Sequence, residues 1–232
     1  IKQKNCQEKT IFLANIREVK AILHVVRCFE DDNILHVHGR IDPEADIDII
    51  NLELILSDVS TLEKRIQSNA KKLKSQDKTV LGQLAVYEKI KRVLDAGNPA
   101  RTVDLTENEL EHIKDLSLLS MKPVIYVANV AESDISLGLD QPYVKKIQPI
   151  AEAEGALVIV ISSKIEQEIS QLSLNEAKEY LLALGVLESG LDKLARASYD
   201  LLGLISYLTT GEKESRAWAI KRGTKAPQAA AV

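Results

Sequence analysis

The stretch KPVIYVANVAESD, residues 122–134, changes from apolar to polar in its middle. Its first part is rich in β-branched residues, which is typical of a strand buried on both faces of a parallel sheet. The run ends at Asn129, and Glu132 follows three positions later, so an amide and a carboxylate stand at the carboxyl end of the predicted strand. Ligands of open α/β sheets bind at that end. The stretch therefore predicts both an α/β fold and a place for a ligand.

Two further apolar runs predict the other strands of the sheet. Residues 21–29, AILHVVRCF, and residues 156–162, ALVIVIS, have the same nearly continuous apolar character. A helical pattern over residues 141–155, ending at Gly155, separates the second strand from the third. Strands that alternate with helices favour an α/β fold with a parallel sheet.

Between the first two strands the apolar period becomes that of a helix. A heptad seam with one polar member is formed by Leu52, Ile55, Val59, Leu62, Ile66, Asn69 and Leu73. A second helical pattern runs from about residue 79 to residue 96 and is followed by Gly97-Asn98-Pro99, which stops a helix. The short polar segment 74–78 joins the two patterns. Together they predict an antiparallel helical hairpin inserted into the sheet.

Composition narrows the classes of function. The chain has 232 residues, of which 45% are hydrophobic and 28% charged, as in an ordinary globular protein, and its net charge of −4 gives no overall basic field for nucleic acid. Two cysteines are too few for a disulfide scaffold and fit a reducing cytoplasm. No apolar stretch approaches the roughly 18–20 residues that span a bilayer, and the polar N-terminus is no signal peptide. We therefore expect a cytoplasmic protein without a membrane partner.

Metal binding is not expected either. His36 and His38 stand at a spacing that metal ligands use, but no Cys, Asp or Glu at a suitable spacing completes a site of four ligands.

A second strand end carries residues that complement Asn129 and Glu132. The run of residues 156–161 is followed by Ser162-Ser163-Lys164. P-loop GTPases hold a nucleotide base with an amide and a carboxylate after one strand, usually N-K-x-D, and a small polar loop after the next, usually S-A-K. The alternative is that both motifs are ordinary polar loops, because N-x-x-E arises by chance in most chains. Their order and separation leave both interpretations open.

Three blocks of sequence resemble the Obg-like ATPase family, also called YchF. They are residues 15–54, residues 122–132 (KPVIYVANVAE) and residues 207–230 (YLTTGEKESRAWAIKRGTKAPQAA), and the resemblance covers about residues 11–230. It implies the C-terminal half of a P-loop GTPase-type parallel sheet, with three strands, the inserted helical hairpin and the start of a TGS domain. The implied domains are a partial nucleotide-binding domain of residues 11–41 and 117–205, a helical coiled-coil domain of residues 42–116 and a truncated TGS domain of residues 206–232.

The resemblance also assigns roles at the two strand ends. In this family N-x-x-E replaces the guanine-binding motif, and ATP is preferred to GTP. Asn129 and the backbone of Val130 would contact adenine, and Glu132 stands where a guanine-binding protein has Asp. An Asp that accepts from N1–H and N2–H₂ of guanine rejects adenine, which lacks both donors, and the longer Glu misplaces these acceptors. The base would be walled by Ser162, Ser163 and Lys164.

One family motif is not found in the sequence. The family carries G-x-x-x-x-G-K-[ST], whose backbone N–H groups and Lys bind the phosphates of ATP next to Mg²⁺. The ten glycines of the chain form no such string, and residues 1–10, IKQKNCQEKT, do not match the glycine-rich switch region of the family. We expect from this a chain truncated at both ends, which lacks the Mg²⁺ site and does not hydrolyse ATP on its own.

Six basic residues lie toward the predicted tip of the hairpin: Lys64, Arg65, Lys71, Lys72, Lys74 and Lys78. They could form a solvated helix end, or contact RNA or the ribosome, because clustered cations bind phosphates and the family associates with ribosomes. Two functions therefore stay open. The chain is part of an ATP-binding ATPase-family protein of translation or stress response, or it is a degenerate relative, a non-catalytic module that binds RNA or protein.

Overall fold

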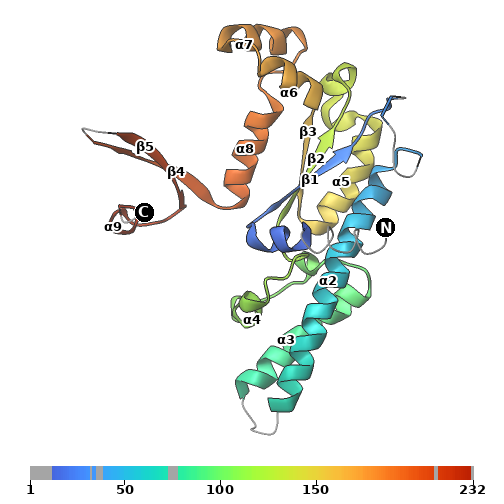
Figure 1. The fold of residues 1–232 in the computed structure, drawn as a ribbon, viewed down its shortest axis with the longest axis vertical. Coiled ribbons are helices and arrows are strands. Elements are labelled where there is room, and N and C mark those ends of the chain that lie inside the picture. The colour runs from blue at the N-terminus through green and yellow to red at the C-terminus, as the bar shows by residue number, and fades with distance from the viewer. Residues whose placement is uncertain (1–11, 32, 35–38, 73–77, 212–213, 231–232) are drawn as a thin grey trace. The chain divides into compact units, whose positions relative to one another are not determined.

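The computed structural model describes residues 12–31, 33–34, 39–72, 78–211 and 214–230 (Figure 1). They form two compact units, each described here by itself. The first comprises the chain up to Ala128 together with Leu139–Val158, and the second comprises Asn129–Gly138 together with the chain from Ile159. The division into domains at residues 42, 117 and 206 stays a prediction.

The three predicted apolar runs form one parallel sheet. Its strands are β1 (Ile22–Arg27), β2 (Val124–Asn129) and β3 (Leu157–Ile161), in the order β1-β2-β3. Residues 124–128 of the central strand are all buried. The predicted α/β fold with a parallel sheet is thus confirmed.

The hairpin consists of α2 (Pro43–Lys72) and α3 (Lys78–Asp95), which lie side by side (Figure 1). Their contact is apolar, because alternating steps of three and four place one stripe of each helix against the other. Ile55 and Leu62 of the predicted seam belong to this core. Leu52 does not, since its side chain is 52% exposed.

The polar member of the seam has a partner on the other helix. Asn69 is buried, and its Nδ2 donates to Oε1 of Gln83 at 3.1 Å. A buried amide without a partner would be unfavourable, so this pair supports one alignment of α2 against α3.

The T-x-x-E of residues 106–109 is a capping-box pattern that predicts a helix over residues 107–119, and the helix of the structure ends earlier. α4 (Glu107–Ile113) begins with the capping box of Thr106 and Glu109, and a short 3₁₀ helix, η3 (Lys114–Leu116), follows it. The chain then turns at Ser117, whose φ is 47°, a value in the left-handed region that stops a helix.

Asp58 of α2 holds the loop beyond this turn. Its carboxylate is buried and accepts from the backbone N–H groups of Leu119 and Ser120 at 2.8 and 2.7 Å and from the Ser120 hydroxyl at 2.6 Å. Burial raises the pKa of Asp58, and the three hydrogen bonds act against this shift. The loop is therefore fixed to α2 by one side chain.

A buried polar cluster joins the hairpin to the sheet within the first unit. Glu154, at the end of α5 (Pro142–Glu154), accepts from Arg101 Nε at 2.9 Å, from the Tyr126 hydroxyl at 2.7 Å and from Asn51 Nδ2 at 2.9 Å. The side chains of Arg101, in η2 (Ala100–Thr102), and Glu154 are each 6% exposed. Their charges are thus paired and hydrogen-bonded, as buried charges must be.

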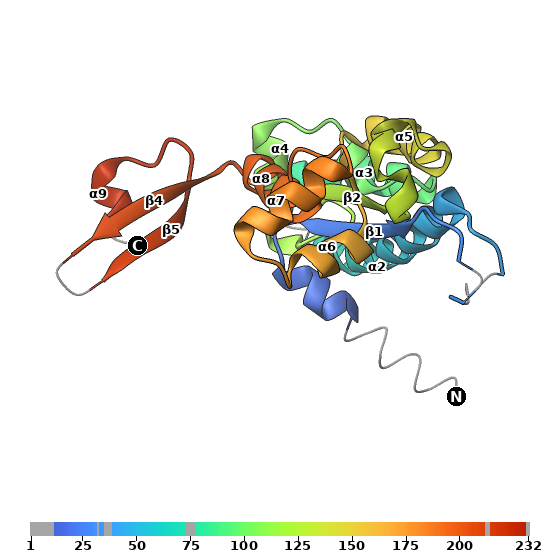
Figure 2. The ribbon, with the colours of Figure 1, turned by 90° about the horizontal axis from the view of Figure 1, so that it is seen from above.

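The second unit contains the ends of β2 and β3, several helices and a two-stranded antiparallel sheet (Figure 2). Its helical elements are the part of η4 (Glu132–Asp140) up to Gly138, α6 (Ser163–Ile169), α7 (Leu174–Ala183), α8 (Gly190–Leu201) and α9 (Ala226–Ala229). The sequence of residues 206–223 predicts two short strands around a turn, and β4 (Leu204–Thr210) pairs with β5 (Ser215–Lys221) there. None of the described helices combines the length and the apolar character that crossing a membrane demands.

The amphipathic pattern of residues 191–205, LDKLARASYDLLGLI, predicts a helix, and the helix of the structure ends earlier. α8 ends at Leu201, because Gly203 takes a positive φ of 61° and starts a turn, and β4 begins at the next residue. Asp200, near this end, accepts from Arg222 at 3.1 Å. Asp200 and Gly203 thus have structural roles, although their spacing matches the D-x-x-G of GTPase switches.

Candidate base-binding site at the ends of β2 and β3

The two predicted motifs lie together in the second unit. The N–H of Val130 donates to the carbonyl of Ile161 at 2.8 Å, so the pairing of β2 with β3 continues one residue past β2. The Asn129 side chain accepts from the N–H of Ser163 at 2.9 Å. The parallel sheet thus brings both polar strand ends into contact, as expected for neighbouring strands.

The contact with Ser163 fixes which way the Asn129 amide points. The Ser163 N–H is a donor, so the Oδ1 of Asn129 must face it, and the NH₂ group points away. No described residue accepts a hydrogen bond from that NH₂ group. Asn amides bind the N7 of purines through such N–H donors. Adenine and guanine both have N7, so this contact recognises a purine without choosing between the two.

Val130 is buried as a whole residue, with 2% of its surface exposed, and its N–H donates to the carbonyl of Ile161. The backbone group left for a base is the carbonyl, which can accept from an amine such as N6 of adenine.

Glu132 is bonded to other side chains of the second unit. Its Oε2 accepts from Lys164 Nζ at 2.6 Å, and its Oε1 lies 3.2 Å from the Tyr180 hydroxyl, which is placed to donate to it. Lys164 lowers the pKa of Glu132, and Glu132 raises the pKa of Lys164, because each charge stabilises the other. Both groups are therefore ionised at neutral pH.

Tyr180 and Glu168 complete this group of side chains. The Tyr180 hydroxyl is hydrogen-bonded to Glu168, which raises the pKa of Tyr180, and Lys164 lies 4.0 Å from Glu168. No sequence pattern pointed to these two residues, because Tyr180 belongs to an amphipathic helix and lies 48 positions from Glu132. We call Glu132, Lys164, Glu168 and Tyr180 the Glu132 cluster.

The loop after β3 has one buried and two exposed members. Ser163 and Lys164 are exposed, whereas Ser162 is 1% exposed and its hydroxyl has no hydrogen-bond partner among the described residues. Glu166 is also buried, and its Oε1 accepts from the N–H of Gly190 at 2.7 Å. Ser163 and Lys164 thus form the accessible surface of the predicted wall, with Ser162 behind it.

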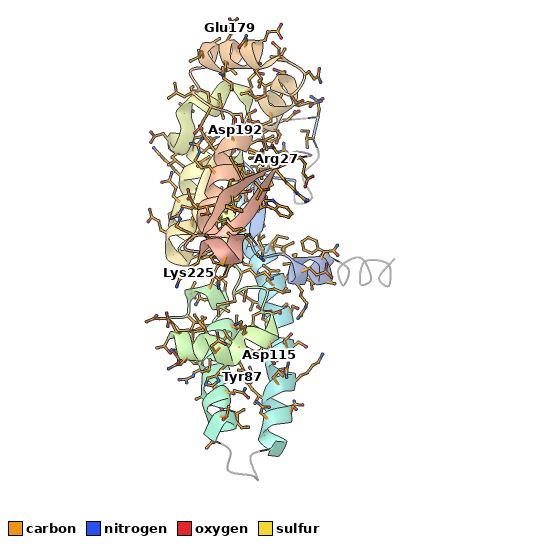
Figure 3. The ribbon with its side chains drawn as sticks, turned by 90° about the vertical axis from the view of Figure 1, so that its left-hand side faces the viewer. Arg27, Tyr87, Asp115, Glu179, Asp192 and Lys225 are labelled. Atoms are coloured by element: carbon orange, nitrogen blue, oxygen red, sulfur yellow. The ribbon has the colours of Figure 1, made fainter. Side chains whose placement is uncertain are left out.

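The basic residues of the hairpin are only partly described. Lys64 is exposed, and Arg65 pairs with Asp115 at 2.8 Å; Figure 3 labels Asp115. Nothing is described of the side chains of Lys71 and Lys72, in α2, or of Lys78, in α3, and Lys74 lies outside the described residues. The contact with RNA stays a prediction.

The described residues contain no group of three or more His, Cys, Asp or Glu placed to hold a metal ion, and His36 and His38 lie outside them.

Comparisons with known proteins place the chain among YchF proteins. Residues 204–232 match the family YchF-GTPase_C, described as a protein of unknown function (DUF933). The ribosome-binding ATPase YchF of Bacillus subtilis (strain 168) is 48% identical over 221 residues, and that of Pasteurella multocida (strain Pm70) 47%; each match covers 95% of this chain and 60% of the relative. The structure of the Schizosaccharomyces pombe YchF GTPase matches with a TM-score of 0.82 and 36% identity, over 95% of this chain and 60% of that one.

The chain spans about 60% of the length of these curated relatives. Over the residues that it shares with them, it belongs to the Obg-like ATPase (YchF) family of P-loop proteins.

Proposed function

We propose that this chain supplies the adenine-binding part of a protein that binds ATP in preference to GTP and works at the ribosome in the cytoplasm. The observation that carries the proposal is the bond from the Ser163 N–H to the Asn129 side chain. It orients an amide donor at the joined ends of two parallel strands, where α/β proteins bind nucleotides. The ribosome enters from the relatives, whose names describe them as ribosome-binding ATPases.

The geometry supports a specific set of contacts with adenine. The NH₂ group of Asn129 would donate to N7, and the carbonyl of Val130 would accept from the N6 amine. Ser163 and Lys164 would line the side of the base. These groups bind and orient the nucleotide, and no described residue is assigned to the transfer of its phosphate.

Nucleotide titration tests the proposal directly. AMP added to the ¹⁵N-labelled chain should shift the NMR signals of the Asn129 side chain and of the Ser163 N–H. The variant Asn129→Ala should bind AMP about 5-fold to 30-fold more weakly, which is the effect of losing one or two hydrogen bonds.

A matched control uses another asparagine of the same unit. Asn175 is exposed on α7, and Asn175→Ala should bind AMP as the unmodified chain does. Equal AMP binding by Asn129→Ala, or shifts that map away from residues 129–132 and 162–164, would contradict the proposal.

A further inference from the structure

We propose that Tyr180 is a positioning residue that sets the base preference of this site by holding the Glu132 carboxylate away from a bound base. The inference rests on the proposed function, because it concerns the same site. The inference adds Tyr180, a residue of another helix, to the site. It also explains the rejection of guanine by the hydrogen bonds of the Glu132 carboxylate, and not by the length of its side chain.

The carboxylate of Glu132 is held from both sides. Lys164 donates to Oε2 at 2.6 Å, and the Tyr180 hydroxyl approaches Oε1 at 3.2 Å. Guanine presents N1–H and N2–H₂ side by side, and a carboxylate recognises it by accepting from both. A carboxylate that accepts from Lys164, and that shares the Tyr180 proton with Glu168, must give up these donors before it can accept from guanine. Adenine has no N1–H or N2–H₂ donors, so its binding does not require this exchange.

Tyr180 is itself held in place by a second carboxylate. Its hydroxyl has one proton and lies between Oε1 of Glu132 and Oε2 of Glu168, with the closer contact to Glu168. The pKa of Tyr180 is raised mainly by Glu168, so the hydroxyl keeps its proton at neutral pH. One proton is thus shared by two carboxylates, and Lys164, near both of them, balances part of their charge.

The local sequence of α7 explains why Tyr180 stands there. The helix begins with a capping box in which Ser173 and Glu176 bond each other's backbone N–H groups, which fixes its first turn. Leu181, next to Tyr180, is buried and anchors the other end of the helix. Figure 3 labels Glu179, the residue before Tyr180, on this helix. The tyrosine ring is therefore carried by a helix fixed at both ends.

The test compares AMP and GMP binding to the full 232-residue chain, followed by the NMR shifts of Asn129 and Ser163. The variant Tyr180→Phe removes only the hydroxyl. We expect it to bind GMP more tightly and AMP as before, so that the preference for AMP falls about 3-fold to 10-fold, as the loss of one hydrogen bond to Glu132 predicts. A residue with a merely structural role would instead weaken both nucleotides equally.

The matched control is Tyr199→Phe. Tyr199 lies on α8 in the same unit and is 39% exposed. This variant should leave both affinities unchanged. If thermal unfolding shows that Tyr180→Phe does not fold, the variant Lys164→Gln replaces it in the test. This variant removes the hydrogen bond to the other oxygen of Glu132, so it should also lower the preference for AMP over GMP.

The outcomes separate this inference from the proposed function. If the unmodified chain binds no AMP up to about 20 mM, well above the millimolar affinity expected for a ligand held mainly by its base, both are overturned. If AMP binds and Asn129→Ala weakens it, but Tyr180→Phe leaves the ratio of the two affinities unchanged, only the role of Tyr180 is overturned. The role of Tyr180 is supported if the ratio of AMP affinity to GMP affinity falls in Tyr180→Phe and is unchanged in Tyr199→Phe.

Discussion

At the scale of single residues, Gly190 shows how tightly the loop behind the base site is packed. A Cβ atom at this position would lie 2.5 Å from Cγ2 and 2.9 Å from Cβ of Ile161, the last residue of β3, and 3.0 Å from Oε1 of Glu166. The same Oε1 accepts from the Gly190 N–H, so the backbone of Gly190 cannot move away without breaking that bond. Glycine is required here by space and not by an unusual φ.

We therefore expect Gly190→Ala to lower the free energy of unfolding by about 1–3 kcal/mol, the usual effect of overpacking. Urea unfolding followed by circular dichroism measures it. Gly211→Ala is the control, since its Cβ would meet only the carbonyl of Glu214 at 3.8 Å, and it should change stability by less than about 0.5 kcal/mol. Equal free energies of unfolding of the two variants would show that Ile161 and Glu166 can shift to accommodate the added methyl group.

The residues of the site differ in how far the sequence could predict them. Asn129, Glu132 and Lys164 follow apolar runs, so the end of a strand places them before any tertiary contact is known. Tyr180 contacts Glu132 only through the tertiary packing of α7, and no local sequence pattern predicts such a contact. The sequence therefore predicted the amide and the carboxylate of the candidate site. It did not predict that Lys164 and Tyr180 are hydrogen-bonded to this carboxylate.

At the scale of elements, the helices that were predicted well are those whose ends are marked by local sequence signals. Ser173 and Gly185 are start and stop signals that predict a helix over residues 173–185, and α7 lies between them. α6 has seven residues and no side-chain cap, so the sequence offered nothing to distinguish it from a loop. Helix ends depend on a few local bonds, whereas the order of the strands follows from long apolar runs.

The strand β1 lies at one edge of the sheet, and its exposed side chains are apolar. Val25 is 60% and Leu23 46% exposed, and both line an apolar groove of about 780 Å³ together with Phe12 and Val19. Edges of this kind pair with other chains unless charge, proline or a bulge protects them.

We expect the 232-residue chain to self-associate through β1. Analytical ultracentrifugation should show oligomers that grow with concentration, and Val25→Lys should shift the chain toward monomer, because a charge at an edge opposes pairing. The control is Leu187→Lys in the second unit, where Leu187 is 90% exposed. A monodisperse chain, or equal effects of the two variants, would argue against association through this edge.

At the scale of the whole molecule, the proposal assigns described residues to the base of a nucleotide and none to its phosphates. The proposed base contacts come from the ends of β2 and β3, but phosphoryl transfer depends on groups that stabilise charge on the phosphate oxygens, above all a P-loop Lys and Mg²⁺. The sequence has no Gly-Lys dipeptide, and the described residues contain no group of three or more His, Cys, Asp or Glu placed to hold a metal ion.

We expect this chain by itself to hydrolyse ATP no faster than the buffer does, even with the adenine base bound as we propose. Release of phosphate from ATP should stay at background in the presence of Mg²⁺, while the ribosome-binding ATPase YchF of Bacillus subtilis, measured alongside, should turn over. The proposed base contacts would orient a nucleotide without stabilising its transition state, and binding of that kind leaves the rate of the chemical step unchanged. Hydrolysis that persists through purification and disappears in Asn129→Ala would show that the chain itself supplies phosphate-binding groups. Hydrolysis that Asn129→Ala leaves intact would come from a contaminating enzyme.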